Sequence, residues 1–147
     1  MVLGATRRRM TDAFDRPTTV VVVGSSHDVR ALAGLLSDDY DVTFVSDRPE
    51  LVSGASADGL DAHEAPLDDG SAIAALGLKA DAAIVAATSD RVNLFVAQHL
   101  RTRGDISQIV VRVNDPDRED VFDGLGAETI CSTDVLAPEI RSALADS

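Results

Sequence analysis

The sequence of 147 residues contains no tryptophan, one cysteine and one lysine, and only 3% of its residues are aromatic. The single cysteine, Cys131, excludes an internal disulfide and a cysteine-built zinc site and fits a reducing compartment. The longest apolar run, residues 82–87, is far shorter than the ~20 residues of a membrane-spanning helix. The start of the chain is polar and arginine-bearing, unlike a secretory signal. We therefore expect a cytoplasmic protein that does not itself insert into a membrane.

Basic residues are scarce: 13 Lys and Arg stand against 25 Asp and Glu, which gives a formal net charge of −12. Nucleic-acid binding needs a basic surface, and only Arg7–Arg9 offers one, so we expect no nucleic-acid partner. The acids are 20 Asp and 5 Glu, and Lys79 is the one lysine. At 1 M salt the Debye length is only about 3 Å, so such a surface hardly repels itself. The composition predicts a salt-loving source, and we expect a halophilic archaeon.

The apolar residues are mostly small and aliphatic, with 21 Ala, 17 Val, 14 Leu and 6 Ile, which suits close packing of helices on a sheet. Residues 1–16 show no clear period and are interpreted as a tail, and 17–147 as one domain. Apolar runs predict strands at 20–23, 42–45, 60–63, 82–87, 108–113 and 129–131. Amphipathic or capped segments predict helices between them, and a last helix over 134–144. This alternation predicts an α/β fold, a doubly wound, Rossmann-like parallel sheet of about six strands with helices on both faces. Ligands of such sheets bind at the carboxyl ends of the strands.

The loop after the first predicted strand is the first candidate site. It consists of Gly24, Ser25, Ser26, His27 and Asp28. A dinucleotide fingerprint G-x-G-x-x-G would have glycines at 24, 26 and 29, and only Gly24 is present. Ser26 could donate its hydroxyl to a phosphate, His27 is a second candidate, and Gly24 is expected to leave its amide room for one. Asp28 suits the helix dipole but opposes an anion. The alternative is an ordinary capped turn without a phosphate.

Three other predicted strand ends carry polar side chains. Asp47 follows the second strand, 23 residues after Gly24, where an acid accepts hydrogen bonds from both ribose hydroxyls of NAD or adenosine. Arg48 could stack on adenine or meet a phosphate, and the alternative is a solvated turn. Thr88 follows the fourth strand, and Arg112, on the fifth, could supply the cation that a diphosphate needs.

Other polar residues near this edge have structural explanations. Asp90, Asn114 and Asp115 are expected to cap helices, and Cys131 is expected to be a small buried residue. His99 lies on an apolar helical stripe, which favours the core or an interface, and His63 ends a strand. No Ser-His-Asp or metal-ligand spacing appears in the sequence, and we expect neither a metal site nor an enzyme.

Several stretches together resemble the TrkA-N domain, the N-terminal half of RCK regulators of potassium transport. They read LGLKADA (76–82), AATSDRVN (86–93), VVRVNDP (110–116) and LGAE (125–128), and the resemblance extends over about 18–144. It implies a Rossmann-like domain that binds NAD(H), ATP or ADP. It also implies dimers, often within larger rings, that gate a potassium channel or transporter when a ligand binds.

The resemblance also implies a set of site residues by position. These are the loop 24–28, then Asp47 and Arg48 at the ribose, Glu64 and Ala65 at the base, and Thr88 and Arg112 in the rest of the pocket. The sequence departs from the family's pattern at Ser26, Val29 and Glu64.

Three functional hypotheses follow. The first is a cytoplasmic regulatory subunit or domain that binds NAD(H), or ATP or ADP, and acts on a membrane potassium channel or transporter, at the inner face of the membrane through that partner. The second is the same fold with a degenerate pocket that serves as a dimeric scaffold. The third, less favoured, is a small NAD-dependent oxidoreductase, because a Rossmann sheet also hosts dehydrogenases.

Overall fold

The structure is a computed structural model that describes residues 18–103 and 105–146. The predicted tail, with Arg7–Arg9, and the predicted domain start at Pro17 lie outside the described residues. The described part of the chain folds around one sheet.

The sheet has six strands, and all neighbouring strands are parallel. They are β1 (Thr19–Val23), β2 (Asp41–Ser46), β3 (Asp61–Glu64), β4 (Lys79–Val85), β5 (Asp105–Val113) and β6 (Glu128–Cys131). Their order is β3-β2-β1-β4-β5-β6, so the chain reverses direction across the sheet between β1 and β4. This is the order of doubly wound nucleotide-binding folds, and it confirms the predicted fold class.

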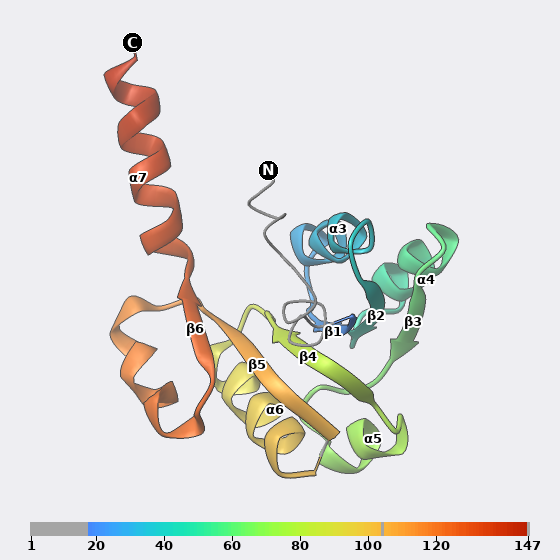
Figure 1. Cartoon of the computed structure of the whole chain (residues 1–147). Helices are drawn as coiled ribbons and strands as arrows, with labels where there is room; N and C mark the ends of the chain where they lie inside the picture. Colours follow the sequence, from blue (N-terminus) through green and yellow to red (C-terminus); the bar gives the residue numbers. More distant parts are fainter. Residues whose placement is uncertain (1–17, 104, 147) are drawn as a thin grey trace, which may run out of the picture.

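Helices cover both faces of the sheet (Figure 1). On one face lie α3 (His27–Leu36) and α4 (Pro49–Ala57). On the other lie α5 (Gly70–Ala75), α6 (Asp90–Arg103) and a 3₁₀ helix, η1 (Pro116–Leu125). The last helix, α7 (Ser132–Ala145), projects away from the body. At η1 the structure has a 3₁₀ helix in which Phe122 is the one buried side chain.

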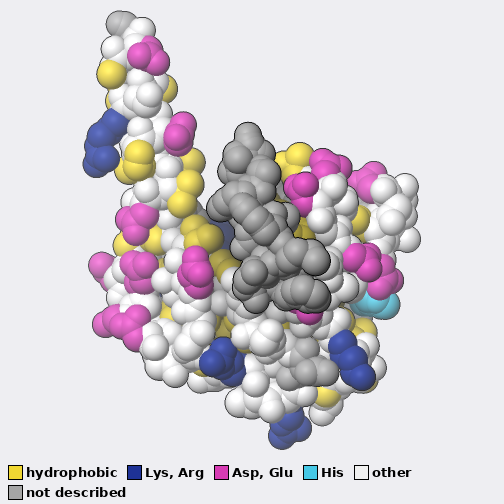
Figure 2. Space-filling model, in the orientation of Figure 1, with side chains coloured by type: hydrophobic (Ala, Val, Ile, Leu, Met, Phe, Trp, Pro, Cys, Tyr) yellow, Lys and Arg dark blue, Asp and Glu magenta, His cyan; other side chains and the backbone are white. Residues whose placement is uncertain are grey.

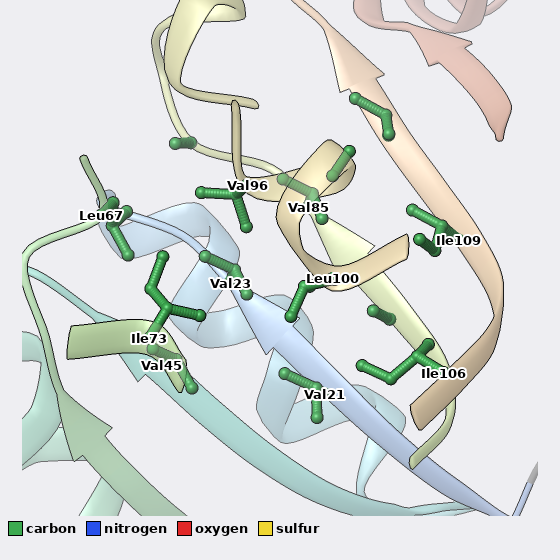
Figure 3. Packing of buried hydrophobic residues seen from close by; sticks show 14 of the residues in the cluster. Val21, Val23, Val45, Leu67, Ile73, Val85, Val96, Leu100, Ile106 and Ile109 are labelled. Atoms are coloured by element: carbon green, nitrogen blue, oxygen red, sulfur yellow. The ribbon is translucent and has the colours of Figure 1, made fainter. Parts of the chain in front are cut away.

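The core consists of two apolar layers, one on each side of the sheet. In β1, Val21 and Val23 point to the layer shared with α5 and α6, which Figure 3 shows, whereas Val20 and Val22 pack toward α3 and α4. Each of these four valines is at most 4% exposed. The β-branched run is therefore buried on both faces, as parallel sheets require.

The amino ends of β1 and β4 are joined by one carboxylate. A single oxygen of Asp81, Oδ2, accepts hydrogen bonds from the backbone N–H and hydroxyl of Thr18, both at 2.9 Å, and from those of Thr19, both at 3.2 Å. The Thr18 bonds, first its backbone N–H, lower the pKa of Asp81 to about 2. The two central strands are thus fastened at the end opposite the predicted site.

Among residues 18–103 and 105–146, no helix lies over part of one sheet face. Beside α3, an apolar groove of about 330 Å³ runs over β4, β5 and β6. Its apolar walls include Leu32, Ile84, Val110, Ile130 and Leu136. No side chain of α7 is buried. The described part of the chain therefore leaves both the groove and α7 uncovered.

Candidate functional site

The sequence-predicted site residues gather at the carboxyl edge of the sheet. The loop 24–28 joins β1 to α3, and Asp47 and Arg48 follow β2. Glu64 ends β3, Thr88 follows β4, and Arg112 is the penultimate residue of β5. Since β1 and β4 are neighbours at which the strand order reverses, these segments meet at the topological switch point.

The backbone N–H of Gly24 is hydrogen-bonded within the fold. Its N–H donates to the carbonyl oxygen of Val45 at 3.0 Å, and a Cβ on Gly24 would lie 2.8 Å from Cβ of Val29. The expectation that the Gly24 amide leaves room for a phosphate is therefore wrong. Its missing side chain instead lets Val29, which stands where the fingerprint has a glycine, pack closely against the strand.

The start of α3 carries a carboxylate in place of a side-chain cap. Ser26 is the N-cap residue but makes no capping bond, because its hydroxyl donates to Oδ1 of Asp28. The N–H of Val29 also donates to that oxygen, at 3.0 Å. The Ser26 bond is the main cause that lowers the pKa of Asp28, slight burial opposes it, and the charge of Arg112 assists it. A negative charge thus lies at the helix end that would receive a phosphate.

Both arginines of the candidate site are paired with acids. Arg48 donates from Nε to Oε2 of Glu50 at 2.8 Å, and from Nη1 to the carbonyl oxygen of Ser25 at 3.2 Å. Arg112 donates from Nη1 to Oδ2 of Asp28 at 3.3 Å. A phosphate at either guanidinium would therefore compete with the acid that is already bound there.

The remaining predicted residues differ in accessibility. Asp47, Glu64 and Thr88 are exposed, and within 18–103 and 105–146 their side chains have no hydrogen-bond or ion-pair partner. Ala65 is 3% exposed, and its N–H donates to the carbonyl oxygen of Ser46 at 3.0 Å. Asp47 is therefore available to accept from two ribose hydroxyls, whereas Ala65 offers little surface to a base.

Asn93 is a structural residue of this edge that the sequence interpretation gave no role. It is 0% exposed. Its Oδ1 accepts from the Ala87 N–H at 2.8 Å, and its Nδ2 donates to the carbonyl oxygens of Ala87 and Arg112 at 2.9 and 3.1 Å. The available signal was a polar residue on the apolar stripe of the predicted helix.

Two of the three predicted helix caps have another role. Asp90 does not cap α6; its carboxylate accepts from the N–H groups of Asn114 at 2.7 Å and Asp115 at 2.9 Å. Asn114 is not a cap either, because its Nδ2 donates to the carbonyl oxygen of Ala87 at 3.0 Å. The sequence could not show that the loops after β4 and β5 lie side by side. Asp115 does cap η1, by accepting from the N–H of Asp117 at 3.0 Å.

The histidines and Cys131 lie in structural settings. His99 is half-buried and stacks on Phe95, with ring centroids 6.2 Å apart, and Nε2 of His63 lies 3.2 Å from Oδ1 of Asp61. Cys131 is buried, as predicted. Among the described residues, no three His, Cys, Asp or Glu side chains form a group that could hold a metal, and no helix is long and apolar enough to cross a membrane.

The solved structures that this chain resembles share the fold. The NAD(P)-binding domain of an exopolyphosphatase-related protein from Archaeoglobus fulgidus matches with a TM-score of 0.73 and 24% identity, over 87% of this chain and 98% of that one. The TrkA-N domain of the inner membrane protein ybaL from Escherichia coli matches with a TM-score of 0.72 and 16% identity, over 88% and 98%.

A channel subunit contains the same fold as one part. The GsuK channel bound to NAD matches with a TM-score of 0.64 and 19% identity, over 79% of this chain and 22% of that one. No curated protein matches the sequence. A model of the TrkA-N domain matches residues 20–133, which is most of the sequence. The chain therefore belongs to the TrkA-N domain family.

Proposed function

We propose that this chain is a regulatory domain of potassium transport that binds an adenine nucleotide without a 2′-phosphate at the carboxyl edge of its sheet. NAD(H) is the first candidate, and ATP or ADP is the next. Membership of the TrkA-N family supports this proposal, as do the fold it shares with NAD(P)-binding domains and the resemblance to the GsuK channel, whose solved structure contains NAD.

The observation that carries the proposal is the position of Asp47. Its exposed carboxylate follows β2, next to β1 and the switch point, and has no side-chain partner in the described part of the chain. A carboxylate there accepts both ribose hydroxyls and repels a 2′-phosphate. We therefore infer a preference for NAD(H) over its 2′-phosphorylated form.

The hydrogen-bond donors at the carboxyl edge fit such a nucleotide when the Asp28 carboxylate moves away from the start of α3. Ser26 makes no capping bond at the start of α3, and the Val29 N–H donates to Asp28, so backbone N–H groups there can receive a phosphate when that carboxylate moves away. Thr88 adds an exposed hydroxyl. Asp28 and Glu64 add repulsion, which molar salt screens where solvent reaches them. We expect binding in high KCl and weaker binding in dilute buffer.

A degenerate pocket is the second candidate, because Gly24 has no free N–H and both arginines are paired. In that case the domain would serve as a dimeric scaffold. We propose regulation in preference to catalysis, because the sequence has no Ser-His-Asp or metal-ligand spacing. A small NAD-dependent oxidoreductase remains the third candidate.

We further propose that the chain works as a dimer, or within a larger ring, against a membrane channel or transporter at its cytoplasmic face. Figure 2 shows hydrophobic side chains along α7 and around its base. They include Val135, Leu136, Ile140 and Leu144, each at least 53% exposed. Apolar surface of this kind usually marks a contact with another protein.

Calorimetric titration with NADH, ATP, ADP and NADPH in molar KCl tests the proposal. NADH is expected to bind and NADPH to bind much more weakly. If no adenine nucleotide binds, the scaffold function is favoured instead. If NADPH binds as well as NADH, Asp47 does not contact the ribose. Steady oxidation of NADH by an added carbonyl acceptor would favour the oxidoreductase.

A further inference from the structure

One guanidinium joins the starts of two helices across the open groove. Arg112, on β5, donates from Nη1 to Oδ2 of Asp28 at 3.3 Å and from Nε to Oγ of Ser132 at 3.0 Å. Asp28 is the second residue of α3, and Ser132 is the first residue of α7. A single side chain on the sheet therefore connects the candidate phosphate position with the projecting helix.

These two bonds engage one nitrogen of each pair of donors that the guanidinium can offer to a phosphate. An arginine binds a phosphate best with two parallel donors, either Nε with Nη2 or Nη1 with Nη2. The first pair includes the donor to Ser132, and the second includes the donor to Asp28. A phosphate held by two donors would therefore compete with Ser132 for Nε or with the Asp28 carboxylate beside Nη1.

The helix at the other end of this connection is weakly held. No side chain of α7 is buried, and its N-cap residue, Cys131, makes no side-chain capping bond. The bond to Ser132 thus fixes the first turn of a helix with little packing of its own. Because packing contributes little to the position of such a helix, a small change in free energy at its base is enough to shift its orientation.

We propose that Arg112 is a relay residue: a diphosphate-bearing nucleotide takes its guanidinium from Asp28 and Ser132 and thereby releases the first turn of α7. This inference rests on the proposed function, and it adds how nucleotide binding would change α7, the helix that we propose contacts other proteins. Without a ligand, Asp28 competes with the phosphate position for the guanidinium and keeps Arg112 bound to Ser132. Adenosine, which lacks the diphosphate, should leave α7 unchanged even when it binds.

The first test is the affinity of Asp28→Asn for ADP, measured by calorimetry in molar KCl. The variant keeps the shape of Asp28 but loses its charge, so it should bind ADP about tenfold more tightly than the wild type. An affinity equal to or weaker than that of the wild type would overturn the internal competition. If the wild type does not bind but Asp28→Asn does, the competition is supported and the proposed function fails for the natural chain. If neither binds ADP or NADH, both proposals fail.

The second test is amide hydrogen exchange of 132–145 in the full chain, with and without saturating ADP. In the wild type, ADP should speed exchange in the first turns of α7, whereas adenosine should not. Ser132→Ala should exchange quickly without ligand and change little on binding. Ser142→Ala, a control on the same helix away from Arg112, should behave like the wild type. Tight ADP binding with unchanged exchange in the wild type, or an equal ADP response in Ser132→Ala, would overturn the relay alone.

Discussion

At the residue scale, the amide side chain of Asn93 is a contact that joins α6 to the ends of β4 and β5. It supplies both a donor and an acceptor to backbone groups that the fold removes from water. Removing the Asn93 amide is costly in free energy, because the Ala87 N–H would lose its hydrogen-bond partner inside the protein. The loop that carries Thr88 and the end of β5 that carries Arg112 therefore depend on Asn93 for their positions.

Asn93→Ala should lower the free energy of unfolding by roughly 1–3 kcal/mol, the cost of leaving a buried polar group unpaired. Urea denaturation in molar KCl measures this change. Gln98→Ala, an exposed change on the same helix, should stay within about 0.5 kcal/mol of the wild type. A loss for Asn93→Ala no larger than that of the control would contradict the role given to Asn93.

At this scale the sequence predicted which polar residues reach the edge but not their partners. Asp47 and Arg112 follow from position, because strand ends of a parallel sheet share one edge. The pairing of Arg112 with Asp28 joins residues 84 positions apart, and no local pattern reveals it. No local pattern reveals either that the Gly24 N–H donates to the carbonyl oxygen of Val45 on the neighbouring strand.

At the element scale, Asp81 fastens β1 to β4. Its folded pKa of about 2 lies below the ordinary 3.8, so its contribution to stability is complete above about pH 4 and is lost as the pH falls toward 2. Asp81→Asn should remove that part of the pH dependence. Thermal melts of both proteins between pH 5 and 2 should therefore converge toward the acid end. A gap in melting temperature that stays constant over this range would contradict the assignment.

The exposed helix α7 gives a second prediction at this scale. In high salt the chain should sediment as a dimer or a larger assembly, because α7 and the groove both expose apolar side chains. Ile140→Glu should shift the equilibrium toward the monomer. Ser142→Glu adds the same charge at an exposed polar position of α7 and should change it less. A wild type that stays monomeric at high micromolar concentration would argue against assembly through α7.

Strands and helices were predictable because their apolar period is local. The β-branched run of β1 and the Asp115-Pro116 start of η1 are examples, and the structure confirms both positions. The 3₁₀ form of η1 and the projection of α7 were not predictable. They depend on how few side chains the rest of the fold can bury, which a periodic pattern does not contain.

At the scale of the whole molecule, charge dominates the expected behaviour. A net charge of −12 should destabilise the folded chain in dilute buffer through self-repulsion. The melting temperature should therefore rise as KCl increases from dilute to molar, because the Debye length falls from about 30 Å at 0.01 M to about 3 Å at 1 M. Sucrose, which does not screen charge, is the control. A melting temperature that stays flat in KCl would contradict the proposed salt-loving origin.

The central claim is that the carboxyl edge binds an adenine nucleotide through Asp47. Titration of NADH into the wild type, Asp47→Ala and Asp41→Ala in molar KCl tests it most directly. Asp41 is exposed at the opposite end of the same strand, so it controls for the loss of one charge. The wild type and Asp41→Ala should bind alike. Asp47→Ala should bind roughly tenfold or more weakly, because it loses two hydrogen bonds to a charged group. Equal binding by all three proteins, or no binding by the wild type, would contradict the account.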